Sequence, residues 1–88
     1  MFNAVKSRCG IAKGIDVYDA EIADYIEDAK IDMLASGVPK SLIDSQGPGV
    51  VTAVTLYVKA YLGNDRSDTE KYLDLYRKKV FRLTLEDG

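Results

Sequence analysis

The stretch DVYDAEIADYIEDAKIDML, residues 16–34, contains seven carboxylates and one lysine, yet its apolar residues recur at helical spacing. Asp16 is suited to be an N-cap, Asp19 would follow at N3, and SGVP at 36–39 provides a stop signal. The stretch therefore predicts an amphipathic helix over about 17–36. At 100° per residue, its core face comprises an arc of seven residues: Ile15, Tyr18, Ile22, Tyr25, Ile26, Ala29 and Met33.

The acidic residues of this helix are spread around the rest of its circumference. They are Glu21, Asp24, Glu27, Asp28 and Asp32. A catalytic or metal site needs side chains that converge, and carboxylate metal sites in helical bundles also use histidine, of which the chain has none. We therefore expect a solvated acidic face, with no catalytic, metal-binding or cofactor-binding residues.

Outward from this helix, glycine, proline and capping signals divide the chain. A short helix is predicted at 2–9, ended by Gly10, and GVPKSLIDSQGPG at 37–49 reads as a connector with at most one turn, around 41–43. A third helix starts near Gly49 and continues through VVTAVTLYVKAYL. A capping box of Ser67 and Glu70 starts the last helix at about 68.

The predicted fold class is all-α, as one domain over residues 1–88. It is a small bundle of three main helices plus a short N-terminal helix, with a long loop between the second and third helices. The predicted core takes one residue from just before the first main helix and the others from all three main helices: Ile15, Ile22, Ile26, Val54, Tyr57, Val58, Leu73, Tyr76 and Val80.

Composition excludes several classes of function. The chain has 88 residues, 47% hydrophobic and 30% charged, with a net charge of −2, which is typical of a globular domain without general attraction to nucleic acid or anionic lipid. Cys9 is the only cysteine and has no histidine to activate it, and the serines have no identifiable base. The first 14 residues lack the apolar run of a signal peptide. We expect no enzyme, no membrane association and a cytoplasmic place of synthesis.

Several apolar residues fall outside the predicted core faces. They are Val17 and Ile31 on the acidic helix, Leu56 on the third, and Phe81 and Leu85 on the last. Single exposed apolar residues are common, but several in so small a domain indicate subunit contacts.

The last helix is basic. KYLDLYRKKVFR, residues 71–82, has five positive charges and one acid. Arg77, Lys78, Lys79 and Arg82 could complement the helix dipole, contact phosphate, or dock on an acidic neighbour. The acidic second helix is such a neighbour, and identical subunits associating head to tail would bring the two surfaces together and form a ring if the rotation closes.

The order of segments carries a resemblance. Four features follow one another along the chain: AVKSRCGI at 4–11, DVYDAEIADYIEDAKIDMLASGVP at 16–39, VVTAVTLYVKAYLGND at 50–65, and a capped final helix. In this order they resemble the head–tail connector (adaptor, head-completion) proteins of tailed bacteriophages and prophages. The resemblance implies a non-enzymatic structural protein that forms a ring of about twelve copies under the portal. The ring would extend the DNA channel and support tail attachment.

The resemblance also implies partners and places. The partners are further copies of the chain, the portal protein, a further connector or tail-completion protein, and genomic DNA that passes through the lumen without sequence-specific binding. The places are the host bacterial cytoplasm during assembly and the head–tail junction of the virion. A lumen poor in cations would let DNA slide, so the acidic helix could line the channel or meet the next subunit.

By analogy with the family, the C-terminal segment would engage the portal. The candidate subunit or portal interface is therefore Val17, Ile31, Leu56, Arg77, Lys78, Val80, Phe81, Arg82, Leu83 and Leu85. The alternative function is a small dimeric helical module that regulates by binding DNA or another protein.

Overall fold

The computed structural model describes residues 1–62 and 66–86, and these contain five helices and no strand. The helices are α1 (Phe2–Arg8), α2 (Asp19–Ala35), α3 (Lys40–Ser45), α4 (Pro48–Leu62) and α5 (Arg66–Thr84). The predicted all-α class and the short N-terminal helix are confirmed. Gly10, with φ of +77°, follows the end of α1 as expected.

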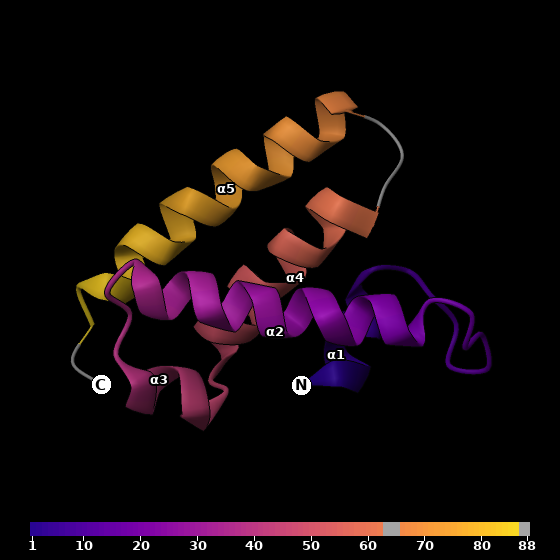
Figure 1. Ribbon diagram of the computed structural model, residues 1–88, viewed down its shortest axis with the longest axis horizontal. Helices are drawn as coiled ribbons and strands as arrows, with labels where there is room; N and C mark the ends of the chain where they lie inside the picture. The colour runs from indigo at the N-terminus through magenta and orange to yellow at the C-terminus, as the bar shows by residue number, and fades with distance from the viewer. Residues whose placement is uncertain (63–65, 87–88) are drawn as a thin grey trace.

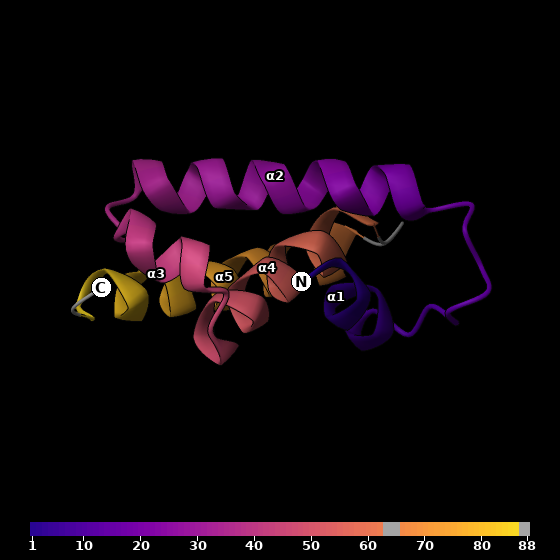
Figure 2. The same cartoon turned by 90° about the horizontal axis from the view of Figure 1, so that it is seen from below.

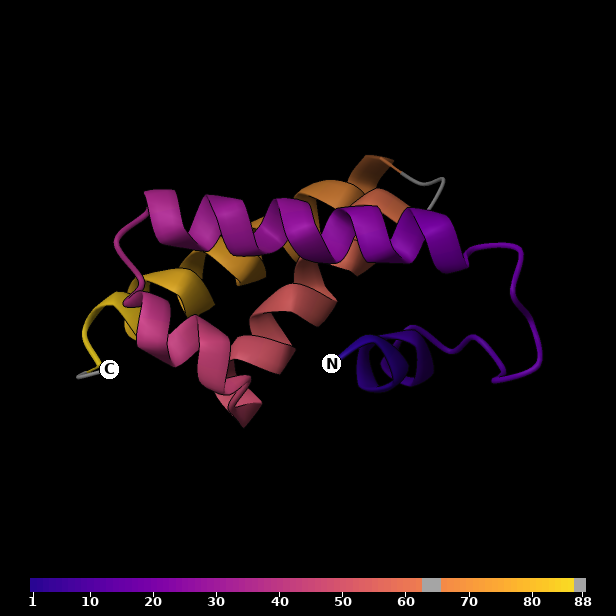
Figure 3. The ribbon, with the colours of Figure 1, turned by 60° about the horizontal axis from the view of Figure 1, so that its bottom comes forward.

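The helices form two layers. Figure 2 shows α2 lying along the long axis of the molecule, above a layer made by the other helices. Figure 3 shows α3 and α1 beneath opposite ends of α2. In Figure 1, α5 approaches the C-terminal end of α2 and diverges from it toward its own N-terminal end. The flattened body measures 36 × 27 × 17 Å. Helix α4 packs against α1, α2 and α5 and is therefore the centre of the fold.

The core is mainly aliphatic, and α4 contributes five of its side chains. Its members are Val5, Ile22, Ile26, Ala29, Met33, Val38, Ile43, Val50, Val51, Ala53, Val54, Val58, Tyr76, Val80 and Leu83. Six of the nine predicted core residues are among them. Tyr57 and Leu73 are only half-buried, and the prediction for Ile15 is wrong, because that residue lies in the loop before α2 with 46% of its surface exposed.

The N-terminus of α2 differs from the prediction. The helix begins at Asp19, Tyr18 is the N-cap residue, and no side chain caps it, so Asp16 is not the N-cap. The reason is a tertiary contact: Oδ1 of Asp19 pairs with the buried Lys6 of α1 at 2.8 Å. Nζ of Lys6 also donates a 3.3 Å hydrogen bond to the carbonyl of Lys13, which ties the loop to both helices.

The C-terminus of α2 is where the stop signal was expected. Gly37 has φ of +100°, its N–H donates to the Leu34 carbonyl at 3.2 Å, and the N–H of Val38 donates to the Met33 carbonyl at 3.0 Å. These two bonds form a Schellman motif, which requires a left-handed residue at the glycine position. Val38 is buried, so the motif also anchors the chain that leaves α2.

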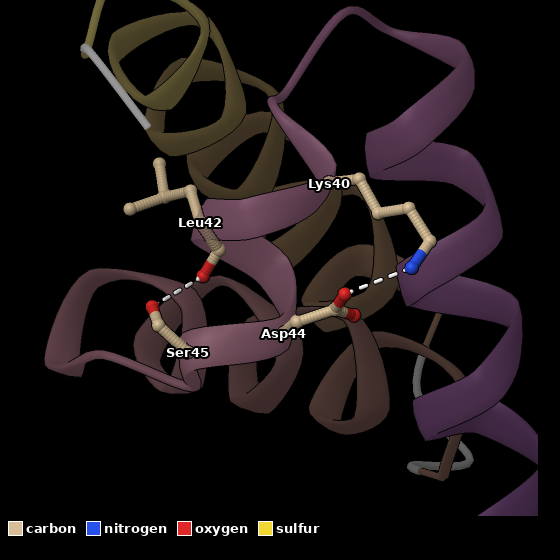
Figure 4. Close-up of polar contacts among 4 residues, drawn as sticks. All are labelled: Lys40, Leu42, Asp44 and Ser45. Carbon is tan, nitrogen blue, oxygen red and sulfur yellow. Dashed lines mark hydrogen bonds and ion pairs between the residues drawn. The ribbon is translucent and has the colours of Figure 1, made fainter.

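The connector contains α3 where a long loop with at most one turn was predicted. Figure 4 shows two contacts within α3: Nζ of Lys40 pairs with Oδ2 of Asp44 at 2.9 Å, and Oγ of Ser45 donates to the Leu42 carbonyl at 2.7 Å. Ile43 is buried in the core. The helix is six residues long, and burial of Ile43 supplies stabilisation that so short a segment lacks alone.

Helices α4 and α5 pack closely at Gly49. A Cβ at this position would lie 3.1 Å from Cδ2 of Leu83 and 3.6 Å from Cε of Lys79. Glycine therefore lets the first turn of α4 approach the last turns of α5. Helix α5 begins at Arg66, two residues before the predicted start, and the predicted capping box depends on the Ser67 side chain, which lies outside the described residues.

Candidate interface surfaces

The outward surface of α2 is acidic with an apolar centre. Ile31 lies opposite the buried Ile22 and Met33 around the helix, and 65% of its surface is exposed. Asp24 and Glu27 are exposed beside it. The predicted solvated acidic face is therefore present. It surrounds the apolar side chain of Ile31, which does not pack into the core.

Helix α5 presents one exposed side toward α2. There a groove of about 420 Å³ is lined by Asp32, Ser36, Tyr76, Arg77, Val80, Phe81 and Thr84. Phe81 is 65% exposed at its edge, and Arg77 is also exposed. Among the described residues, Arg77 makes no ion pair within 4.0 Å, so its charge is available to an external partner.

The other side of α5 faces away from α2. A second groove of about 260 Å³ is lined there by Leu56 of α4 and by Leu75, Lys78, Lys79 and Arg82 of α5. Nζ of Lys78 pairs with Oδ2 of Asp74 at 3.0 Å, but both side chains are exposed, so water and salt weaken the pair. This groove combines apolar walls with three cations.

The candidate interface residues divide into exposed and buried sets. Val17, Ile31, Phe81 and Leu85 are exposed apolar residues, and Arg77, Lys78 and Arg82 are exposed cations. The assignment of Val80 and Leu83 is wrong, since these residues are only 6% and 1% exposed and fill the core from the inner face of α5. Leu56 was expected to point away from the core but is half-buried and packs against it.

Tyrosine side chains connect α2, α4 and α5. Tyr25 stacks on Tyr61 at a centroid distance of 5.8 Å, Tyr61 contacts Tyr57 at 4.8 Å, and Tyr57 meets Tyr76 edge-on at 5.2 Å. The Tyr76 hydroxyl donates a 2.7 Å hydrogen bond to Oδ2 of Asp32. Burial and this hydrogen bond raise the pKa of Tyr76 well above its ordinary value. The cluster therefore links the two layers of the fold.

The part of the chain that the structure describes holds no group of three or more potential metal ligands. Burial raises the pKa of the Cys9 thiol, an effect that nearby Lys59 only partly opposes, and this disfavours the nucleophilic thiolate. Of the helices described, none is both long and apolar enough to cross a bilayer.

Sequence reasoning missed two features of these surfaces. Leu75 and Lys79 line the groove of α5 that faces away from α2. Leu75 was not considered as an interface residue, and Lys79, considered as a docking cation, was left out of the candidate interface. Their spacing from Lys78 and Arg82 on one helical face was a signal that could have found them. The hydrogen bond from Tyr76 to Asp32 joins residues 44 positions apart, and no local pattern in the sequence indicates it.

Comparison with known protein families gives a match over the whole chain. The model of a family described as "Phage connector protein" matches residues 1–88. No curated protein and no solved structure matches the chain. The matching family is structural and non-enzymatic, which agrees with the exposed apolar and charged side chains on α2 and α5. The resemblance to head–tail connectors is confirmed. Since the match covers its whole length, this chain belongs to the phage connector protein family.

Proposed function

We propose that the protein assembles as a ring under the portal of a phage or prophage, extends the DNA channel, and supports tail attachment. The observation that carries this proposal is the exposure of Ile31 on the outer face of α2, directly opposite the core. Val17, Phe81 and Leu85 are likewise exposed. Apolar side chains on several separate surfaces of an 88-residue domain favour a protein with several protein neighbours.

Charge segregation supports contact between unlike surfaces of successive copies. The outer face of α2 is acidic, whereas α5 carries Arg77, Lys78 and Arg82 as exposed cations. Contact between two different surfaces generates rings when the rotation closes. A net charge of −2 also suits a lumen through which DNA slides, because dense rows of cations would bind phosphates tightly.

The C-terminal part of α5 is the proposed portal contact. Phe81, Arg82 and Leu85 are exposed there, and they remain candidates after Val80 and Leu83 are removed. Portal docking would cover the Phe81 side chain and the edge of the groove that it shares with α2. The further partner would be another connector or tail-completion protein on the opposite rim of the ring.

The proposal is tested by light scattering coupled to size-exclusion chromatography across a range of protein concentrations. We expect oligomers larger than a dimer, with a mass that rises with concentration until one closed species dominates. Charge reversal by Arg77→Glu with Lys78→Glu should reduce assembly; unchanged assembly would assign these cations to stabilising their own helix. A tight dimer that is retained on a DNA column at moderate salt would instead favour the regulatory module.

A further inference from the structure

The outer face of α2 has an ordered pattern around its apolar residue. Asp28, Glu27 and Asp24 lie three, four and seven residues before Ile31, and all four side chains are exposed. These intervals place them on one side of a helix, along a line of two turns. The face therefore presents an apolar group at one end and three acids that run from it toward the N-terminus of α2.

Helix α5 has the reverse pattern on the side that faces away from α2. Lys78, Lys79 and Arg82 lie three, four and seven residues after Leu75. Leu75 is exposed, and Leu56 of α4 completes the groove beside it. This face presents an apolar group and three cations that run from it toward the C-terminus of α5.

We propose that the outer face of α2 in one copy docks antiparallel on this groove of α5 in the next copy. With Ile31 against Leu75 and Leu56, the equal intervals bring every acid opposite a cation. The pairs are Asp28 with Lys79, Glu27 with Lys78, and Asp24 with Arg82. The proposal rests on the proposed ring and specifies which surfaces form its subunit contact.

A parallel docking with the same apolar contact is disfavoured. It would place Asp28 opposite Lys71, Glu27 opposite Tyr72, and Asp24 opposite Asp68. Only one of these pairs is attractive, and the last is repulsive. Like charges in contact are costly and suppress wrong associations, whereas exposed opposite charges contribute modestly to affinity. The charges therefore select the register, and burial of Ile31 supplies the apolar contact.

The two surfaces point in different directions within one protomer. The α2-facing side of α5 carries Arg77 and Phe81, while the side with Leu75 and Lys79 lines a groove that includes no residue of α2. The outer face of α2 in turn points away from the layer that contains α5 (Figure 2). A copy docked through one surface leaves the other free, so the contact is head to tail and can propagate around a ring.

Charge exchange between the two surfaces tests the register. One variant carries Asp24→Lys, Glu27→Lys and Asp28→Lys, a second carries Lys78→Glu, Lys79→Glu and Arg82→Glu, and a third combines both sets. We expect each one-sided variant to associate at least about tenfold more weakly than the unmodified protein. The third variant should regain association, and an equimolar mixture of the first two should also assemble, because each contact again joins opposite charges.

A control with Lys13→Glu changes an exposed cation outside both surfaces and should assemble normally. Circular dichroism checks that each variant keeps its helical content. One-sided variants that assemble like the unmodified protein would overturn the register but leave the ring intact. Failure of the unmodified protein to assemble would instead overturn the ring itself.

Disulfide trapping gives an answer even if a charge variant fails to fold. In protein with Cys9→Ser, the pair Asp28→Cys and Lys79→Cys should form intermolecular disulfides under mild oxidation and give a ladder of oligomers. The pair Asp28→Cys and Lys71→Cys, which matches the parallel alignment, should form few. A ladder from the second pair and none from the first would overturn the antiparallel docking.

Discussion

The hydroxyl of Tyr76 on α5 lies 2.7 Å from Oδ2 of Asp32 on α2 and donates a hydrogen bond to it. The same hydroxyl lies 3.4 Å from the carbonyl of Ala29. Because α5 diverges from α2 toward its own N-terminus (Figure 1), this contact joins the two helices where they approach each other. It therefore helps to set the relative position of the acidic and basic surfaces.

Tyr76→Phe should destabilise the protein by about 1 kcal/mol. The variant keeps the aromatic ring against Tyr57 but loses a hydrogen bond to a charged acceptor, and the exposed Asp32 can be hydrated instead. Chemical denaturation monitored by circular dichroism measures the change. A stability equal to that of the unmodified protein would show that the bond does not hold α5 on α2.

Stability should fall as the pH rises above about 10, the ordinary pKa of tyrosine. Burial and the hydrogen bond to Asp32 raise the pKa of Tyr76 in the folded state, so the unfolded chain releases its proton first. The stabilisation contributed by Tyr76 is fully present below its pKa in the unfolded chain. It is lost as the pH rises from there toward its pKa in the folded protein. Tyr76→Phe should make this decline shallower, although Tyr25 and Tyr57, whose pKa values burial also raises, still contribute. An identical pH slope in the two proteins would contradict this assignment.

Gly37→Ala should destabilise the protein by about 1 kcal/mol, because alanine must adopt a positive φ to keep the Schellman motif. The nearest atom to the added Cβ would be Cγ2 of Thr84 at 3.9 Å, so backbone strain and not crowding is the cause. Gly14→Ala is the matched control. A Cβ there meets nothing within 4 Å and the φ is not left-handed, so thermal unfolding should change little. Equal effects at both glycines would refute the explanation.

Lys6 and Asp19 form an ion pair, and substituting one should destabilise the protein by a different amount from substituting the other. Asp19→Asn leaves the buried ammonium of Lys6 without its carboxylate and should cost about 2 to 3 kcal/mol. Lys6→Met removes the partner of the buried Oδ1 of Asp19, but 38% of the Asp19 side chain is exposed, so the carboxylate can turn toward water and the cost should be about 1 kcal/mol. Denaturant midpoints of both variants give the comparison. The opposite order would mean that Asp19, and not Lys6, bears the cost of burial.

Ile31→Asp should preserve helical content and weaken assembly, because the side chain is outside the core and inside the proposed subunit contact. Ile15→Asp alters another exposed isoleucine, in the loop before α2, and serves as its control. Sedimentation velocity at matched concentrations separates the two. Assembly of the Ile31→Asp variant at the level of the unmodified protein would remove Ile31 from the interface.

Helical spacing predicted the inner faces of the helices well. Ile22, Ile26, Ala29 and Met33 recur along α2 as expected and are buried. The boundaries were less predictable, because the ion pair of Asp19 with Lys6 is a tertiary contact that overrides a good N-cap signal at Asp16. The connector was underestimated for a similar reason, since α3 depends on burial of Ile43 in a core that local sequence does not reveal.

The candidate interface shows the same division. Exposure of Ile31 and Phe81 follows from their positions around the helix and was predicted. Val80 and Leu83 were assigned to the interface by analogy with the C-terminal segment of the family. That analogy covers the whole segment and does not distinguish the inner side of the helix from its outer side. The groove of Leu75 and Lys79 needs Leu56 from α4, so only the packing of α4 on α5 creates it.

The central claim is that the protein acts by assembling with copies of itself. Negative-stain electron microscopy of the purified protein at high concentration tests it most directly. We predict closed rings with a central opening, and these should disappear in the variant with Asp24→Lys, Glu27→Lys and Asp28→Lys. Uniform single particles of monomer size at every concentration, with or without added portal protein, would contradict the claim.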